Sequence, residues 1–279
     1  MKYYLETNAL YSIGKFPDKY FRNFYTSILS LYELVSGIKK ENFTKRKNVL
    51  NKIFNTSITI VWEMPEKLVF SSFNVTKDYE YLEHRVEPLR NIINKILNSD
   101  SYETFSQSTE YRTEPYNFNY FRELDKSWSK GFIESTIRGN QRIKHDIKRN
   151  NNSFILNGVS YNIHRNKDLA SFYEAETLLN QSITILALSN MIKEKGLTDA
   201  IGTIYNSYNG LIDNYIVGFS MFCADKMIMS DSPATNDFVD LTHLIYLTNV
   251  EDCKIVSNDN IFDKFFEHKR IKIEELTNN

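Results

Sequence analysis

The pattern of hydrophobic and polar positions divides the chain into an α/β beginning, a long middle part and an α/β end. Residues 2–6 form a short apolar run that is typical of a buried strand, and the β-branched run TSITIVWEM at 56–64 predicts a second strand. Between them, apolar side chains at residues 26–38 cover most of a helix circumference, with Thr26 or Ser27 as its cap. A basic helix follows it. We therefore expect strands to alternate with largely buried helices.

The same alternation returns near the C-terminus. The pattern predicts a helix at 236–247, a strand at 253–259, a short helix at 260–269 and a final strand at 270–276. Strands that alternate with helices form a parallel sheet with right-handed crossovers, covered on both faces. The predicted fold class is therefore α/β, with a parallel sheet of about four strands flanked by helices.

The middle of the chain, residues 65–199, has a different character, because aromatic and charged residues alternate there without a strand period. The exception is a predicted β-hairpin near 154–163, where Asn-Gly separates two apolar runs. Long helices are predicted at 168–196 and again at 198–228. Three glycines recur eight residues apart in this last region and suggest close helix packing: Gly202, Gly210 and Gly218.

Composition narrows the class of protein. With 279 residues and 42% hydrophobic side chains, the chain can bury a sizeable core. Its net charge of -1 excludes a generally basic nucleic-acid wrapper, so contact with a polyanion needs a local patch. The two cysteines do not form a disulfide framework, and the apolar runs are too short to span a bilayer. We expect a cytoplasmic protein without a signal peptide or a membrane contact.

Acidic residues occupy positions where the pattern favours apolar ones. Glu6 ends the first strand and Asp259 follows the late strand, so both lie at one edge if these strands are parallel neighbours. Glu33 is surrounded by apolar residues on its helix and needs a partner, a metal or a cleft, unless it lies on a narrow exposed stripe. Asp240 lies in line with the core-facing stripe of its helix. The alternative function for Asp259 is to cap the helix that follows it.

Four carboxylates gathered at one edge repel each other. Two charges about 5 Å apart cost about 3 kcal/mol at an effective dielectric constant of about 20. A fold that keeps such a cluster needs something to neutralise it. Because the sequence offers no cysteine ligand and no obvious histidine ligand there, oxygen-only ligation predicts a hard cation, Mg²⁺ or Mn²⁺.

These acids lie in stretches that resemble the PIN-domain nucleases, a family that includes the ribonuclease toxins of toxin–antitoxin pairs. The stretches are YYLETNAL, SLYELVSGI, NDFVDLTHLIYL and IVSNDNIF. The resemblance implies a PIN-like α/β domain formed by residues 1–64 and 200–279, interrupted by a mostly helical insertion at 65–199. It assigns the family's catalytic acids to Glu6, Glu33, Asp240 and Asp259, with Asp237 as an additional acid.

The resemblance implies an endoribonuclease that hydrolyses phosphodiester bonds with Mg²⁺ or Mn²⁺. The implied metal ligands are Glu6, Asp240, Asp259 and Asp237. Glu33 would complete the shell or orient the attacking water. Small polar residues beside the acids would support the carboxylates by hydrogen bonds: Thr7, Asn8 and Ser257. The implied partners are an RNA substrate, with DNA as the alternative, an antitoxin-like inhibitory protein, and a second copy of the chain as a further option.

One departure from the family concerns the first acid, which is usually Asp and is Glu6 here. The carboxylate reaches about 1.5 Å further, whereas Mg²⁺ favours near-ideal octahedral geometry. A second hypothesis is therefore a PIN-like binding or assembly module that has lost catalysis and uses the insertion as its partner surface. Binding of Mn²⁺ and loss of cleavage in Asp240→Asn separate the two hypotheses.

Two groups of basic residues are candidates for contact with a phosphate backbone. Lys39 and Lys40 follow the helix that carries Glu33, and the insertion contributes Arg138 and Arg142. The tyrosines and phenylalanines of TEPYNFNYF are candidates for stacking on unpaired bases. The alternative for such charge runs is a solvated helix face.

Overall fold

A five-stranded parallel sheet forms the centre of the protein. The structure is a computed structural model, and it describes residues 1–76, 85–107, 117–149, 153–156, 158–162, 166–229, 231–234, 236–248 and 252–277. Its sheet has the order β3-β2-β1-β6-β7, and every neighbouring pair is parallel. The strands are β1 (Lys2–Leu5), β2 (Phe24–Ser27), β3 (Thr59–Val61), β6 (Cys253–Val256) and β7 (Arg270–Ile271). The predicted α/β class is confirmed.

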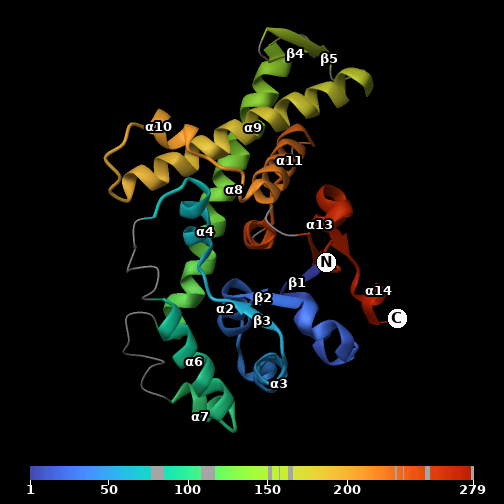
Figure 1. Ribbon diagram of the computed structural model, residues 1–279. Coiled ribbons are helices and arrows are strands. Elements are labelled where there is room, and N and C mark those ends of the chain that lie inside the picture. Colours follow the sequence, from blue (N-terminus) through green and yellow to red (C-terminus); the bar gives the residue numbers. More distant parts are fainter. Residues whose placement is uncertain are drawn as a thin grey trace.

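Helices surround this sheet, and α3 and α11 lie on opposite sides of it in Figure 1. In the first half of the chain they are α1 (Thr7–Leu10), α2 (Ile28–Ser36), α3 (Phe43–Phe54), α4 (Pro65–Ser72), α6 (Val86–Asn98), α7 (Tyr102–Ser106) and α8 (Phe118–Arg149). In the second half they are α9 (Asn166–Glu194), α10 (Ile201–Asn206), α11 (Asp213–Met229), α12 (Asp237–Thr242), α13 (Asn260–Phe266) and α14 (Ile273–Thr277). A 3₁₀ turn, η5 (His243–Tyr246), continues α12. Within the described ranges, further 3₁₀ turns are Ile13–Lys15, Asp18–Asn23, Lys40–Asn42 and Glu267–Lys269.

The sheet differs from the prediction in its number of strands, five instead of about four. The sequence pattern missed strand β2, because it assigned Thr26 and Ser27 to the start of a helix that begins only at Ile28. β2 is short and adds to β1, and the Thr26 hydroxyl donates to the Leu5 carbonyl at 2.8 Å. The expected last strand is only two residues long and then becomes α14, because its final residues complete a helical turn.

The middle of the chain contains the expected hairpin and long helix. β4 (Ser153–Leu156) and β5 (Val159–Asn162) pair antiparallel around Gly158, which has a positive φ of 79°. They lie at the far end of α8 and α9 from the sheet (Figure 1). The single helix expected at 198–228 is instead α10 and α11. Gly210, with φ 82°, lies in the turn between them.

The hydrophobic core joins the sheet to the middle of the chain. Tyr4 and Leu5 of β1 are fully buried, and the same core includes Ile93 of α6, Phe118 of α8 and Ile204 of α10. The division into a nuclease domain and an insertion at 65–199 stays a prediction, because one core extends through both. None of the helices within the described ranges is both long enough and apolar enough to pass through a membrane.

Candidate active site

Two of the predicted acids follow neighbouring strands. β1 and β6 pair in parallel, so the residues after both strands emerge at the same carboxyl edge of the sheet. Glu6 is the N-cap of α1, and its carboxylate accepts a hydrogen bond from the backbone N–H of Asn8 at 2.6 Å. Asp259 is the N-cap of α13 and accepts from the N–H of Ile261 at 3.1 Å. The expected edge position is confirmed, and both acids also cap helices.

Glu33 projects from α2 toward the same edge. Its Oε2 accepts hydrogen bonds from the Thr7 hydroxyl of α1 and from His243 Nε2, the latter at 2.7 Å. Its side chain is 22% exposed. Ser30, which would share an exposed stripe with Glu33, is buried instead. Ser36 and Gly37, the other residues of that stripe, are partly exposed, as Glu33 is. Glu33 therefore has the expected partner and also lies on a face of α2 that is in part exposed.

Asp240 on α12 completes the cluster. Burial is the main cause that raises its pKa to about 8, and the charges of Glu33, Asp259 and Glu6 raise it further, while His243 opposes them. Each of these charges is close enough to Asp240 to change its pKa. The four acids that are far apart in the sequence are therefore neighbours in the fold.

Glu6 has a similar environment and is only 4% exposed. Burial raises the pKa of its carboxyl to about 7, against the opposing effects of the His243 charge and of hydrogen bonds from Asn8 and Ser257. The Glu33 charge contributes to the increase. Near neutral pH Glu6 and Asp240 therefore both carry a proton part of the time, because full ionisation would crowd like charges in a poorly solvated place.

Asp237 lies at the margin of this cluster. It occupies the first turn of α12, where its carboxylate accepts a hydrogen bond from the Ala234 N–H at 2.7 Å. Burial raises its pKa, and the Asp259 charge is among the further causes. Asp237 thus lies in the first turn of α12, where the helix dipole favours a negative charge, and it is within electrostatic reach of Asp259.

The three small polar residues proposed as supports each contact an acid. Thr7 donates to Glu33, and the backbone N–H of Asn8 donates to Glu6. Ser257 is fully buried, and its hydroxyl accepts from the Asp259 N–H at 2.9 Å. The side-chain hydroxyl makes the contact at Thr7 and at Ser257, whereas Asn8 acts through its backbone N–H.

His243 is the residue of the site that the sequence analysis missed. It is 1% exposed and lies between the acid cluster and the core. Burial lowers its pKa, but the charge and hydrogen bond of Glu33, together with the charges of Glu6 and Asp240, outweigh burial, so the net shift is upward. The available signal was its spacing, since it follows Asp240 by three residues and so shares a helical face with it.

The carboxylate oxygens of the cluster are ligands that a hard cation prefers, but the side chains are not arranged as a preformed metal site. In the described ranges, no group of three or more His, Cys, Asp or Glu side chains is arranged to hold a metal ion. The carboxylates of Glu6, Glu33 and Asp259 each accept hydrogen bonds from protein donors. The raised pKa values of Glu6 and Asp240 nevertheless mark a place where an added positive charge would be favourable.

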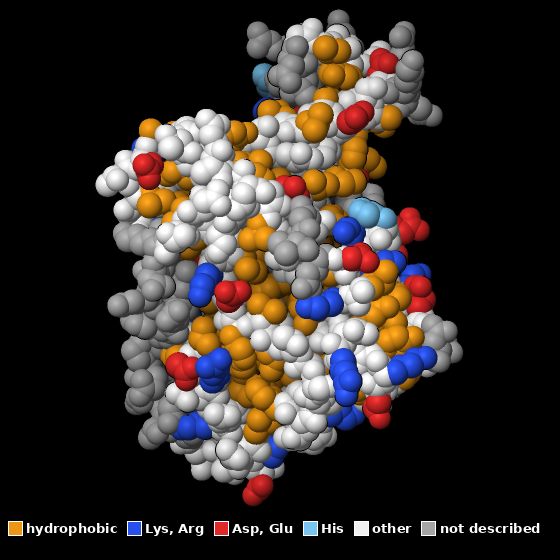
Figure 2. All heavy atoms as spheres, viewed as in Figure 1, with side chains coloured by type: hydrophobic (Ala, Val, Ile, Leu, Met, Phe, Trp, Pro, Cys, Tyr) orange, Lys and Arg blue, Asp and Glu red, His pale blue; other side chains and the backbone are white. Residues whose placement is uncertain are grey.

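The predicted basic contacts are dispersed. Lys39 and Lys40 are exposed, and Lys40 forms an ion pair with Glu103 at 2.6 Å. On the face shown in Figure 2, Lys and Arg side chains alternate with Asp and Glu and form no single basic patch. Phe118, from the stretch expected to stack on bases, is buried in the core, so that expectation is wrong for this residue. Residues 113–116 of the stretch lie outside the described part.

Arg138 and Arg142 do lie together, on a groove of about 640 Å³ between α8, α9 and α11. Apolar residues of α11 and α12, including Phe219 and Phe238, form part of its lining. Arg142 donates to Glu176 at 2.6 Å, which offsets part of its charge. Since α12 also carries Asp240, the groove adjoins the helix that contributes to the acid cluster.

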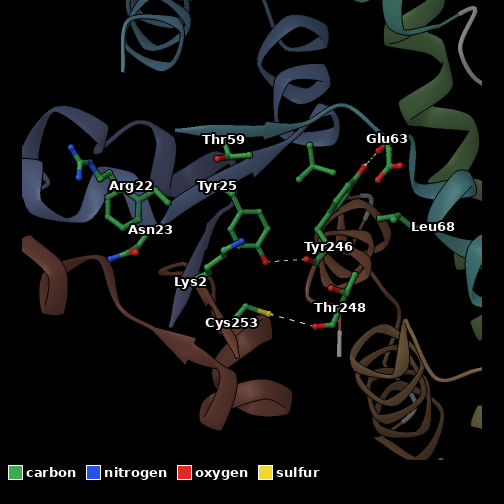
Figure 3. A pocket seen from close by; sticks show the side chains of 12 residues that line it. Lys2, Arg22, Asn23, Tyr25, Thr59, Glu63, Leu68, Tyr246, Thr248 and Cys253 are labelled. Atoms are coloured by element: carbon green, nitrogen blue, oxygen red, sulfur yellow. Dashed lines mark hydrogen bonds between the residues drawn. The ribbon is translucent and has the colours of Figure 1, made fainter. Parts of the chain in front are cut away.

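A second pocket, shown in Figure 3, lies at the opposite edge of the sheet. Its volume is about 250 Å³, and its lining includes Lys2, Phe24, Thr59 and Cys253, which begin β1, β2, β3 and β6. Because parallel strands share one direction, their first residues gather at the edge away from the acids. This pocket is therefore separate from the candidate active site.

Known proteins provide no assignment for this chain. No protein-family model, curated protein or solved structure matches it. The likeness to PIN-domain nucleases therefore rests on the four quoted stretches and on the acids they contribute to the cluster.

Proposed function

We propose that this chain is a metal-dependent nuclease that hydrolyses phosphodiester bonds, with RNA as its substrate class. The observation that carries the proposal is the gathering of Glu6, Glu33, Asp240 and Asp259 at one edge of a parallel sheet. Such a cluster favours a cation, and oxygen ligands favour a hard one, Mg²⁺ or Mn²⁺. The order of the motifs along the chain, as in PIN-domain nucleases, supports the same reaction.

In this proposal Glu6, Asp240 and Asp259 hold the cation, and Asp237 adds charge at the margin. A bound cation supplies positive charge beside the phosphate and acidifies water. The carboxylates have to turn from their present donors to reach a common centre, and for Glu6 and Asp259 these donors are backbone N–H groups. The extra methylene of Glu6 gives its carboxylate the reach to move from the backbone N–H of Asn8 to a bound cation.

Glu33 has a separate part in this proposal. Because Thr7 and His243 both donate to Oε2, the carboxylate is held at one oxygen. Glu33 is also more exposed than the buried Glu6. It is therefore suited to orient the attacking water and to accept its proton, which is general-base chemistry.

The substrate surface that we propose is the groove at Arg138 and Arg142. Arginine side chains at its rim suit phosphate oxygens, and its aromatic lining suits an unpaired base. Lys39 and Lys40 remain candidates for contact with the phosphates at the other end of a bound RNA. An antitoxin-like protein that covers this groove and the acids would inhibit the enzyme.

Cleavage assays test the proposed function directly. Structured RNAs, single-stranded DNA and flap substrates are incubated with the protein and either Mg²⁺ or Mn²⁺. We expect RNA cleavage that EDTA abolishes and that Asp240→Asn reduces by at least about 100-fold. Asp199→Asn, an exposed acid that is not in the cluster, is the matched control and keeps full activity. Cleavage that survives EDTA would contradict the proposal.

A binding or assembly module without catalysis is the second candidate. The observation that favours it is that Glu6, Glu33 and Asp259 already accept hydrogen bonds from protein donors. Isothermal titration with Mn²⁺ separates the two candidates. A nuclease binds Mn²⁺ through the cluster and cleaves RNA, whereas a module of this kind does neither.

A further inference from the structure

A chain of buried hydrogen bonds links the centre of the sheet to Glu33. Tyr4, in β1, has its hydroxyl 2.7 Å from Ser27 Oγ and 2.6 Å from His243 Nδ1. The opposite ring nitrogen, His243 Nε2, is 2.7 Å from Glu33 Oε2. Tyr4, Ser27 and His243 are each at most 1% exposed. The four residues come from β1, β2, α2 and η5, so the chain connects separate elements.

The chemistry of these groups sets the direction of the bonds. A carboxylate only accepts, so the hydrogen between His243 and Glu33 belongs to Nε2. In a neutral imidazole Nδ1 is then the acceptor, and the Tyr4 hydroxyl donates to it. Burial strongly raises the pKa of Tyr4, so its hydroxyl keeps the proton that it donates. Ser27 then donates to the Tyr4 oxygen.

Packing holds the histidine ring in the same place. The Tyr4 ring stacks on Tyr246 at 5.7 Å and also lies against the His243 ring, with ring centroids 5.7 Å apart. His243 and Tyr246 both belong to η5, so one short turn carries both partners of Tyr4. The imidazole is therefore fixed both by hydrogen bonds at its two nitrogens and by ring contacts.

We propose that His243 is a positioning residue for Glu33, and that Tyr4 in turn sets the orientation of His243. The hydrogen bond at Oε2 leaves the second carboxylate oxygen, Oε1, available for the water or cation of the proposed nuclease. Among the described residues, two hydrogen bonds reach Oε2 of Glu33 and none reaches its Oε1. This inference rests on the proposed function and adds two residues to its site.

Paired amide substitutions test the position of the donor. The side-chain amide of His243→Gln reaches the place of Nε2 and can still donate to Glu33, whereas that of His243→Asn reaches only the place of Nδ1. We expect the Asn variant to weaken Mn²⁺ binding and to lower kcat by about 10- to 100-fold, with KM for RNA unchanged. The Gln variant recovers most of both losses.

Tyr4→Phe is the second test and keeps the aromatic ring. It removes the partner of Nδ1, so we expect a kcat loss of about 10-fold with the fold retained. Tyr25→Phe is its matched control, because Tyr25 also lies in the sheet and donates to a backbone carbonyl, that of Tyr246 at 3.0 Å. Circular dichroism and thermal unfolding of each variant confirm that it is folded.

The outcomes separate the two proposals. If the wild-type protein neither binds Mn²⁺ nor cleaves RNA, the proposed function fails and the positioning inference fails with it. Suppose instead that the wild type binds Mn²⁺ and cleaves RNA. If His243→Asn and His243→Gln then have the same Mn²⁺ affinity and kcat as each other, or as the wild type, only the positioning inference is overturned. Equal kcat losses in Tyr4→Phe and Tyr25→Phe would overturn the part assigned to Tyr4. The inference is supported if His243→Asn loses Mn²⁺ affinity and kcat while His243→Gln keeps most of both.

Discussion

The carboxylates at the edge of the sheet serve two purposes that conflict. Glu6 and Asp259 cap helices, which favours their charged forms, and yet they lie in a cluster that disfavours further negative charge. Burial and the neighbouring acids raise the pKa of Asp240 to about 8. Residues that lower the stability of the metal-free protein are typical of functional sites.

Asp240→Asn is therefore expected to stabilise the metal-free protein while it removes activity. The amide keeps the shape of the side chain and removes one charge from the cluster. Because the raised pKa means that ionising Asp240 opposes folding, we expect the amide to increase the free energy of unfolding by several kcal/mol at pH 8. Urea unfolding in EDTA measures the gain.

The control for this measurement is Asp199→Asn, whose exposed carboxylate lies outside the cluster. Its free energy of unfolding should change by less than about 0.5 kcal/mol. A loss of stability in Asp240→Asn would show that the Asp240 charge is favourable in the folded protein, and would remove the electrostatic support for a cation there.

At the scale of elements, glycines explain how closely α11 approaches its neighbours. Gly202, Gly210 and Gly218 do not form a repeat, although their spacing suggested one. A Cβ at Gly218 would lie 2.4 Å from Phe266 of α13 and 2.6 Å from Leu244 of η5. Gly210 occupies a turn, and nothing lies within 4 Å of a Cβ at Gly202. Of these three glycines, Gly218 is the one that close packing requires.

Gly218→Ala should destabilise the protein by about 1–3 kcal/mol, because Phe266 and Leu244 are buried and have little room to move. Gly202→Ala is the matched control, and it should be neutral or should stabilise by up to about 1 kcal/mol through helix propensity. Thermal unfolding compares the two variants. Equal effects would show that the approach of α11 to α13 and η5 is not tight.

Local patterns placed most strands and helices of the two α/β ends, but they gave no bounds for α4, α6, α7 and α8. They also missed β2, because its four residues begin a longer apolar segment that continues as α2. Its four residues are extended only because β1 and β3 lie on either side of them. The break between α10 and α11 has a similar cause. A helical pattern continues through it, but the Asn209 N–H donates to the Ser72 carbonyl of α4 at 2.8 Å, which ties the turn to another element.

At the scale of the whole molecule, the cluster makes stability depend on pH in an unusual direction. The pKa values of Glu6 and Asp240 are raised to about 7 and about 8, above the values of an unfolded chain. The pKa of His243 is also raised. The folded protein therefore binds more protons than the unfolded chain, so its stability falls as the pH rises through these values.

We expect the Tm of the metal-free protein to fall as the pH increases from about 6 to about 8.5. Mn²⁺ should reduce this slope, because it binds the ionised carboxylates and stabilises the folded state. Differential scanning calorimetry in EDTA and in Mn²⁺ measures both effects. Asp240→Asn should also show a smaller slope. A Tm that rises over this range without metal would contradict the raised pKa values.

The sequence by itself determined the α/β class, the hairpin, and the placing of Glu6 and Asp259 at strand ends, because each follows from local periodicity and from the shared direction of parallel strands. Only the tertiary structure decided that Glu33 is bonded to His243 and that Tyr4 supports that histidine. These contacts join residues up to 239 positions apart. No local pattern records which buried polar groups meet, because the meeting depends on how separate elements pack and on the need to pair every polar group that they bury.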